Sequence, residues 1–396
     1  MSAAGEHSAH RARLERLARA LGEHEVDALL VYTPVNIRYL TGFTGTNALV
    51  LVRAGGELGG ADGRFLTDFR YATQSAAQVG ELLEREIASG ELLDAAAHRL
   101  REAAPDGGRL GFDDATLTVA QHARLREQLG ASWQLIACGG AVERLRAVKD
   151  DQEIARIRGA AELADAALTR VLEQGLVGRS EREIAVELEL QMRRLGAEGP
   201  SFPSIVAAGA HAALPHAEPR EQTIPADVLV TIDWGALHDG YCSDCTRTYA
   251  TGEHIPEEAR AIYELVRDAQ AQALAAVRPG PNGRELDAVA RTVIERAGQG
   301  EHFGHGLGHG VGIEIHEGPR LSRTAGDEPL LAGNVVTVEP GVYLPGELGV
   351  RIEDLVVVGG GGEGDRGDGG DGGGELSEGS GHRVLSGLPK ELTVVG

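Results

Sequence analysis

The strongest constraint on the fold is a pattern that the second half of the chain repeats. Two helices followed by an antiparallel β-ribbon are predicted within residues 143–252, and the same order of elements is predicted within residues 256–358. Helices that alternate with ribbons in this way need a shared sheet to cover their apolar faces. We therefore expect an α+β domain with a pseudo-repeat and a central curved sheet.

Local signals set the limits of the predicted helices in this half. Residues 143–175 read as one long amphipathic helix with acidic residues in its first turn. Ser180 and Glu183 form a capping box at the start of the next helix, which ends near Gly196. The other two helices are predicted over residues 256–278 and 283–298.

The first half of the chain is predicted to be a separate α/β unit. Residues 12–140 alternate Val- and Leu-rich strands with helices and carry no cluster of polar residues at ligand spacing. We expect a structural or regulatory role for this unit. The domain plan is a disordered N-terminus over 1–11, the first domain over 12–140, a linker over 141–150 and the second domain over 151–396.

A Gly-rich acidic segment, residues 359–381, interrupts a strand that resumes at residues 382–385. Such a composition buries too little apolar surface to order itself. The segment is therefore predicted to be a disordered insertion in a hairpin loop.

Composition excludes several classes of function. The net charge of −22 argues against nucleic-acid binding, because phosphate backbones need a basic surface. No run of eighteen apolar residues is present, so no membrane span is expected. Three cysteines do not make a disulfide framework, and the start of the chain lacks a secretory pattern, so the cytoplasm is predicted. Cys242 and Cys245 lie in a strand-like segment that points their sulfurs to opposite faces, which argues against a redox or zinc pair.

Two aspartates form the first candidate metal-ligand pair. If residues 237–240 make a four-residue loop, the ladder sets Asp233 opposite Asp244. Like charges directly across a ladder destabilise it unless a cation lies between them. On this hairpin alone, the alternative is that both carboxylates face solvent as ordinary turn-flanking acids.

Two glutamates repeat the arrangement nearer the C-terminus. A hairpin with its loop centred near Gly346 sets Glu339 on one strand opposite Glu353 on the other. Two such carboxylate pairs strengthen the metal interpretation, because a single pair has an ordinary explanation.

The stretch 304–317, "GHGLGHGVGIEIHE", places three histidines among alternating glycines. Two aspartates, two glutamates and one histidine would supply enough ligands for two divalent ions, and carboxylate-rich sites suit Mn²⁺. Ions roughly 3.5–4 Å apart activate water and polarise a carbonyl group. The glycines are interpreted as clearance that lets backbone and substrate come close to the metals.

With these residues in place, the chain resembles the pita-bread-fold metallopeptidases of the prolidase and aminopeptidase P branch over essentially its whole length. The motifs that match are Asp233 in "TIDWG", Asp244 in "SDCTRT", His309 in "HGLGHGVG", Glu339 in "TVEPGVY" and Glu353 in "RIEDLV". The resemblance implies that these five residues are the metal ligands. It also implies a C-terminal pita-bread (creatinase/aminopeptidase) fold behind a smaller creatinase-like α/β domain, two divalent ions (Mn²⁺, or else Co²⁺ or Zn²⁺) and a homodimer.

The same resemblance assigns the remaining site residues. His216 in "AALPHAEP" is expected to contact the substrate and His316 in "EIHEGPR" to stabilise the intermediate or to move a proton. Arg320 and Arg351 match substrate-holding or shell-orienting positions, where a guanidinium fork suits a carboxylate. For Arg351 a structural ion pair with a neighbouring acid is the alternative.

Three further points complete the expected site. Glu339 is expected to act as general base in addition to binding metal. His305 is expected beside the ligands without binding metal, whereas His211 and His238 are given no role in the site.

The implied activity is hydrolysis of a peptide bond that precedes proline, by an Xaa-Pro dipeptidase (prolidase). The alternative within the branch is an Xaa-Pro aminopeptidase that shortens longer peptides, although the N-terminal domain here is of the short kind. A pita-bread protein that only binds a partner is the second alternative, but such relatives usually lose ligands. Two other enzymes of the fold are disfavoured, because creatinase lacks the full ligand set and methionine aminopeptidase does not normally carry this N-terminal domain.

Overall fold

The computed structural model describes residues 3–55, 63–359 and 381–396. The chain divides into two compact units, Met1–Arg146 and Ala147–Gly396. The boundary falls inside the expected linker 141–150, most of which is helical, because α6 spans Ala141–Ala147. None of the helices in the described part of the chain is long and apolar enough to cross a membrane.

The first unit is an α/β unit, as predicted. Its six strands form one mixed sheet in the order β4-β3-β2-β1-β5-β6. The strands are β1 Ala28–Val31, β2 Ala48–Arg53, β3 Gly63–Asp68, β4 Glu84–Ala88, β5 Gly108–Phe112 and β6 Trp133–Ala137. The helices that precede α6 are α1 Ala3–Ala20, α2 Pro34–Thr41, α3 Ala72–Gln78, α4 Leu92–Ala103 and α5 Val119–Leu129.

The disorder predicted for residues 1–11 is wrong from Ala3 onward, because α1 begins there. Leu14 and Leu17 are fully buried, and the apolar face they form fixes the helix on the unit. The His10 ring nitrogen Nδ1 lies 3.1 Å from the Tyr39 carbonyl oxygen, which anchors the helix further upstream. Three of the seven residues between Ala3 and Ala9 are alanine, which has the highest helix propensity, so the helix continues toward the N-terminus.

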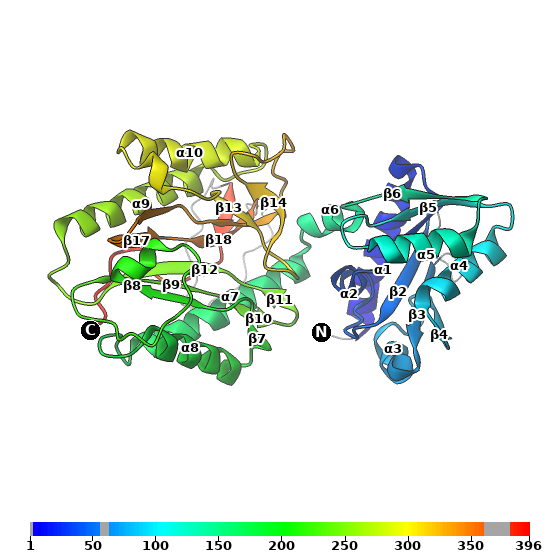
Figure 1. The fold of residues 1–396 in the computed structure, drawn as a ribbon, viewed down its shortest axis with the longest axis horizontal. Coiled ribbons are helices and arrows are strands. Elements are labelled where there is room, and N and C mark those ends of the chain that lie inside the picture. Colours follow the sequence, from blue (N-terminus) through cyan, green and yellow to red (C-terminus); the bar gives the residue numbers. More distant parts are fainter. Residues whose placement is uncertain (1–2, 56–62, 360–380) are drawn as a thin grey trace. The chain divides into compact units, whose positions relative to one another are not determined.

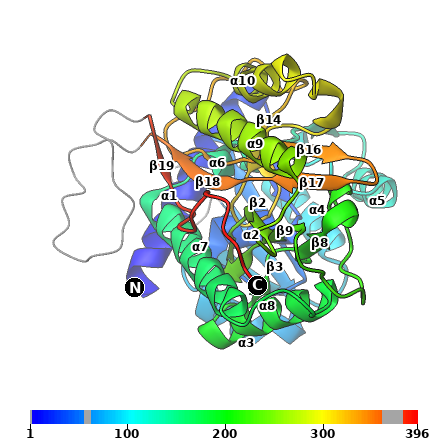
Figure 2. The same cartoon turned by 90° about the vertical axis from the view of Figure 1, so that its left-hand side faces the viewer.

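The second unit contains the two predicted helix pairs. They are α7 Asp151–Leu172 with α8 Glu181–Leu195, and α9 Glu257–Ala276 with α10 Gly283–Arg296. The predicted capping box at Ser180 and Glu183 is present, with Gly196 as the left-handed C-cap. In Figures 1 and 2 the strands of this unit lie between the two helix pairs.

The single long helix predicted over residues 143–175 is two helices. Asp150 separates them, because its side chain accepts hydrogen bonds from the Gln152 and Glu153 backbone amides and starts α7. The amphipathic pattern continues across the break, so periodicity alone did not detect it. The cap fixes the new helix direction.

The first ribbon of the unit is built on β9. Strand β9 (Leu229–Trp234) pairs with β8 (Ile205–Ala208) and β12 (Cys245–Ala250), and β10 (Ala236–His238) pairs with β11 (Tyr241–Cys242). A short strand, β7 (Gly199–Pro200), pairs with the other edge of β10.

The predicted register of this ribbon is wrong by two residues. The hairpin turns on only Asp239 and Gly240, both at positive φ, so Asp233 pairs with Thr246 and not with Asp244. An Asp-Gly pair favours such a two-residue turn, which the prediction replaced with a four-residue loop. Because the error is an even number of residues, the predicted face of each side chain is unchanged.

The second ribbon has the predicted register. Val338 of β15 (Val335–Val338) pairs with Asp354 of β18 (Asp354–Val358). Beyond it, β16 (Gly341–Leu344) pairs with β17 (Leu348–Arg351) around Gly346, which has positive φ. Glu339 therefore lies opposite Glu353 in the gap between the two pairings.

The remaining strands extend the sheet that contains β15 and β18, in the order β14-β13-β15-β18-β19. They are β13 Gly308–Gly310, β14 Glu317–Leu321 and β19 His382–Val384. The antiparallel pairing of β18 with β19 confirms that the chain resumes the sheet after the Gly-rich segment. At the base of this hairpin the Gly359 amide donates a 2.7 Å hydrogen bond to the Gly381 carbonyl. Of the insertion predicted to be disordered over 359–381, residues 360–380 lie outside the described ranges.

Each helix pair buries its apolar face against one part of these sheets. Leu168 of α7 and Ile184 of α8 share a core with Ile232 of β9. On the other side, Val266 of α9 and Val356 of β18 belong to a second core, which also includes α10. The predicted pseudo-repeat therefore corresponds to two similar halves, each with its own core.

Candidate metal centre

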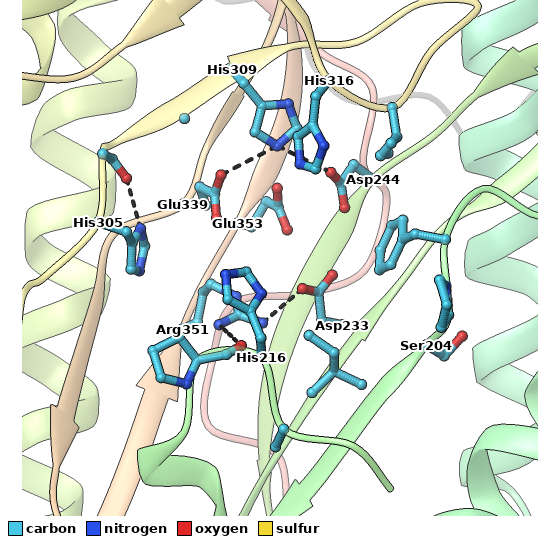
Figure 3. Close-up of a pocket in the computed structure, with 18 of the residues that line it drawn as sticks. Ser204, His216, Asp233, Asp244, His305, His309, His316, Glu339, Arg351 and Glu353 are labelled. Carbon is cyan, nitrogen blue, oxygen red and sulfur yellow. Dashed lines mark hydrogen bonds and ion pairs between the residues drawn. The ribbon is translucent and has the colours of Figure 1, made fainter. Parts of the chain in front are cut away.

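Five side chains that the sequence analysis singled out as metal ligands converge in one pocket of about 460 Å³ in the second unit. Asp233 is in β9, Asp244 directly precedes β12, His309 is the middle residue of β13, Glu339 directly follows β15 and Glu353 directly precedes β18. In Figure 3 the four carboxylates point into the space between His309 and His316 on one side and His216 and Arg351 on the other.

Backbone pairing between the two ribbons brings the carboxylates together. An isolated β-bridge joins Thr246 to Glu353, and the Glu353 amide donates a 3.1 Å hydrogen bond to the Thr246 carbonyl. Both ribbons are interrupted at the ligand positions, next to this bridge. The ligand side chains from β9, β12 and β18 therefore enter the same pocket.

The distances within the cluster match a shared cation site. Ligand atoms of Asp244, His309 and Glu353 all lie within 4.8 Å of one another. His309 Nε2 lies 3.5 Å from Asp244 Oδ2 and 3.4 Å from Glu339 Oε1. These gaps are longer than direct hydrogen bonds and leave room for an ion between the donors.

The tautomer of His309 favours metal binding. Its Nδ1 lies 3.1 Å from the Gly310 carbonyl oxygen, to which an Nδ1–H group donates. The neutral ring then presents an unprotonated Nε2 to the carboxylates, as a metal-ligating histidine does. Burial lowers the pKa of His309 to about 4, so the ring is neutral at pH 7.

Burial and mutual repulsion of the carboxylates oppose their ionisation. Burial, followed by the charge of Asp233, raises the pKa of Glu339 to about 8. Burial and then the neighbouring carboxylates also raise the pKa values of Asp244 and Glu353 well above the ordinary range. A positive charge in the pocket would stabilise the ionised forms, which is the condition for a metal site.

The carboxylate of Asp233 gives a further test of the fit. Its Oδ2 accepts a 2.7 Å hydrogen bond from Arg351, whereas its Oδ1 is buried and has no hydrogen-bond partner among the described residues. A buried carboxylate oxygen without a partner is costly. A divalent cation would satisfy this oxygen, so the donor set fits metal binding.

Two threonines that the sequence analysis missed hold carboxylates of the candidate ligands. Thr337 Oγ1 donates to Glu339 Oε1 at 3.2 Å, and Thr246 Oγ1 donates to Glu353 Oε2 at 2.7 Å. Each lies two residues from a ligand, Thr337 from Glu339 and Thr246 from Asp244. The period-2 alternation of a strand would have placed both threonines on the ligand face.

His305 lies beside the ligands and does not present a free nitrogen to them. Its Nδ1 lies 2.7 Å from the Gly306 carbonyl oxygen, and its Nε2 lies 2.9 Å from the hydroxyl of Tyr343. That hydroxyl also accepts a 2.7 Å hydrogen bond from Arg351. Arg351, Tyr343 and His305 therefore form a chain of hydrogen bonds. Tyr343 was missed, because its sequence context is that of an ordinary buried strand residue.

The structure brings only some of the other predicted site residues to the pocket, and Arg320 is not among those that line it. His216 and His316 line the pocket, and the rings of His316 and His309 pack edge to face with centroids 4.4 Å apart. Burial, followed by the charges of His216 and Arg320, lowers the pKa of His316. Arg320 lies on β14 opposite His309 in the ladder, with its side chain exposed.

The two histidines that were given no role lie elsewhere. His211 pairs with Glu181 at 2.9 Å, and His238 is at the end of β10. Cys242 and Cys245 are buried and form no disulfide with each other.

The glycines of the His-rich stretch provide clearance for neighbouring backbone. A Cβ atom on Gly308 would overlap the carbonyl oxygen of Thr337 in β15, and one on Gly310 would overlap the carbonyl oxygen of Gly318. A Cβ atom on Gly306 would lie 2.8 Å from the Leu321 carbonyl oxygen. The close approach holds β13 between β14 and β15, and that position directs His309 into the pocket.

Comparison with known proteins agrees with this geometry. Residues 155–359 match metallopeptidase family M24, and residues 13–148 match the creatinase/prolidase N-terminal domain. The chain is 36% identical to an Xaa-Pro dipeptidase of Pyrococcus furiosus over 348 residues, which is 87% of this chain and 94% of the relative.

Two solved structures share the fold over nearly their whole length. An Xaa-Pro dipeptidase from Bacillus anthracis superposes with a TM-score of 0.86 at 38% identity, covering 97% of this chain and 99% of that one. An X-Pro aminopeptidase from Thermotoga maritima superposes with a TM-score of 0.80 at 32% identity, covering 95% of this chain and 99% of that one.

Proposed function

The chain belongs to metallopeptidase family M24, and from this premise we propose that it is an Xaa-Pro dipeptidase, which hydrolyses the peptide bond before proline. The two-domain fold expected from the ligand motifs is confirmed, with a creatinase/prolidase N-terminal domain in front of the metallopeptidase domain. The observation that carries the proposal is the convergence of four carboxylates and His309 in one pocket.

The apolar part of the pocket lining supports a substrate that contains proline. Apolar and proline side chains line the pocket together with the candidate ligands, and they suit a compact, uncharged ring. They are Phe202, Pro203, Ile205, Pro215, Pro219 and Ile315. Similarity to relatives named Xaa-Pro dipeptidase supports a dipeptide substrate for this chain. Similarity to an X-Pro aminopeptidase leaves longer peptides as the alternative substrate.

Two divalent ions would be held by the five ligands, and Mn²⁺ is proposed because carboxylates dominate the set, with Co²⁺ or Zn²⁺ as alternatives. The ligands are Asp233, Asp244, His309, Glu339 and Glu353. When bound, such ions supply Lewis acidity that polarises the scissile carbonyl group and acidifies the attacking water.

The chain's own residues would move the protons and orient the substrate. The Glu339 carboxylate, held at Oε1 by Thr337, takes a proton from the water and delivers it to the leaving nitrogen. The neutral His316 ring donates a hydrogen bond to the developing oxyanion. His216 contacts the substrate from the opposite wall, and Arg320 binds a substrate carboxylate.

Location and assembly complete the proposal. The cysteines at 138, 242 and 245 form no disulfide, which supports the reducing cytoplasm. A homodimer is proposed from the family resemblance, and sedimentation that shows only a monomer would remove this part.

The deciding experiment is hydrolysis of Ala-Pro and of Ala-Pro-Ala with Mn²⁺, before and after chelation. Cleavage of the dipeptide alone supports the dipeptidase, and preference for the tripeptide supports the aminopeptidase. If the protein binds Mn²⁺ but cleaves neither peptide, the proposed activity is wrong and a binding role is favoured. Asp244→Ala should abolish turnover without unfolding the protein, and retained turnover would contradict the ligand assignment.

A further inference from the structure

The loop that carries His216 enters the metal pocket from outside the two ribbons. It spans residues 208–220, between the end of β8 and the segment that leads to β9, and it contains a 3₁₀ turn, Gly209–Ala213. Ala217 is buried, whereas His216 before it is exposed in the pocket wall. Figure 3 shows His216 directed toward the ligand carboxylates. The loop is not part of a strand or a long helix, so other contacts must fix its position.

One buried carboxylate, that of Glu181, contacts both ends of this loop. Its Oε1 accepts a 3.0 Å hydrogen bond from the Ala208 amide, and its Oε2 accepts one of 3.0 Å from the Arg220 amide. The Arg220 guanidinium also donates to both oxygens, at 3.2 and 3.3 Å, and His211 Nδ1 lies 2.9 Å from Oε2. The two ends of the loop thus share one anchor.

The anchor itself is buried at the start of a helix and lies outside the metal pocket. Glu181 is the first residue of α8 and is 1% exposed. It lines a separate hollow together with His211 and Arg220. From the side of the metal pocket, Arg351 donates a 3.2 Å hydrogen bond to the Pro215 carbonyl, next to His216. The loop is therefore held at its middle by the site and at its ends by Glu181.

We propose that Glu181 is a positioning residue, which holds the 208–220 loop so that His216 faces the reacting centre. The proposal rests on the proposed function, because His216 is the group that meets the substrate. Charge-assisted hydrogen bonds to a buried carboxylate are strong and directional, so those of Glu181 fix both ends of the loop together. Without it, Ala208 and Arg220 would lose their common acceptor, and His216 would sample positions away from the pocket.

The test compares two glutamates of the same helix turn. Glu181→Ala removes the anchor. Glu183→Ala is the matched control, because Glu183 accepts a 2.7 Å hydrogen bond from the Ser180 amide and stabilises the start of α8. The measurements are hydrogen exchange of peptides that cover residues 208–220, bound Mn²⁺ per chain, and kcat and KM for Ala-Pro.

The expected result separates the two variants. Glu181→Ala should accelerate exchange in residues 208–220 and lower kcat/KM at least about tenfold, since a misplacement near 1 Å can cost on the order of 100-fold. Its Mn²⁺ content should remain that of the wild type, because no metal ligand is touched. Glu183→Ala should leave exchange in this loop and kcat/KM within about twofold of the wild type, because a cap acts on helix stability.

Equal exchange in residues 208–220 for the wild type and Glu181→Ala would overturn the proposal, as would an equal loss of kcat/KM in both variants. If Glu181→Ala does not fold, Arg220→Ala decides, because it removes the guanidinium bonds and leaves the backbone amide to bind Glu181. It should give the same changes to a smaller degree, and unchanged exchange would again overturn the proposal.

Hydrogen exchange does not depend on which peptide the enzyme cleaves. A wild type that is inactive on Ala-Pro would therefore refute the proposed function, whereas the exchange measurement would still test whether Glu181 anchors the loop.

Discussion

A single guanidinium connects the two ribbons of the candidate metal centre. Arg351 donates to Asp233 Oδ2 at 2.7 Å and to Thr246 Oγ1 at 3.0 Å, and Thr246 in turn donates to Glu353. The sequence left open a substrate contact, a role in orienting the metal ligands, or an ion pair with a neighbouring acid, and the structure has an ion pair with Asp233. The acid is itself a predicted ligand, so the pair orients the metal site.

Replacing Arg351 with Lys tests this orienting role, because lysine keeps the charge and loses the planar fork. We expect kcat/KM or Mn²⁺ affinity to fall by about 10- to 100-fold, as for other partners of metal ligands. Steady-state kinetics and metal titration by calorimetry measure the two quantities. Values within about threefold of the wild type for both would show that charge alone suffices.

Among the elements, strand β13 owes its position to glycines, which have no Cβ atom. Gly308 lies against β15, where any Cβ atom would overlap the Thr337 carbonyl oxygen. Thr337 also accepts a 3.1 Å hydrogen bond from the His309 amide. Displacement of β13 therefore moves His309 and the threonine that holds Glu339 at the same time.

Gly308→Ala should consequently lower stability by about 1–3 kcal/mol through overpacking and should weaken Mn²⁺ binding. Gly304→Ala is the control, because a Cβ atom there has no neighbour within 4 Å. Urea unfolding and metal titration of both variants provide the comparison. Similar losses of stability and metal affinity in the two variants would mean that these positions need glycine for backbone flexibility and not for clearance.

At the scale of the whole molecule, the buried carboxylates couple stability to metal and to pH. In the metal-free protein, burial and the charge of Asp233 raise the pKa of Glu339 to about 8, from an ordinary value of 4.5. The folded state then binds more protons than the unfolded state between these values. Below pH 6.5 the lowered pKa of His309 acts in the opposite direction, because the unfolded state binds that proton more tightly. The stability of the metal-free protein should therefore fall as pH rises from about 6.5 through 8.

Chelated protein should accordingly melt at lower temperature at pH 8 than at pH 6.5, by roughly 3–6 °C, since 1 kcal/mol shifts Tm by about 2–4 °C for a unit of the size of the second one. Mn²⁺ should restore most of the loss at pH 8. Asp244→Asn is the internal control, because it removes one of the repelling charges. It should melt higher than chelated wild type at pH 8 and gain less from Mn²⁺, and a lower Tm for this variant without metal would contradict the electrostatic explanation.

Much of the candidate site followed from local sequence patterns. The loop centred on Gly346 and the period of two along each strand were enough to place Glu339 opposite Glu353. The error of two residues at Asp233 left every side chain on its predicted face. Tyr343 and Glu181 could not be found in this way, because their partners lie far away in the sequence.

The sequence by itself determined the helix pairs, the capping box at Ser180 and the ribbon periodicity, because these depend on neighbours within a few residues. The five candidate ligands came from the paired carboxylates together with the family resemblance. Only the tertiary structure decided that Thr246 bridges to Glu353, that Arg351 binds Asp233, and that Glu181 closes the His216 loop. The physical reason is that these contacts form when packed helices and strands bring distant segments together. Their geometry depends on the whole second unit and not on any local pattern.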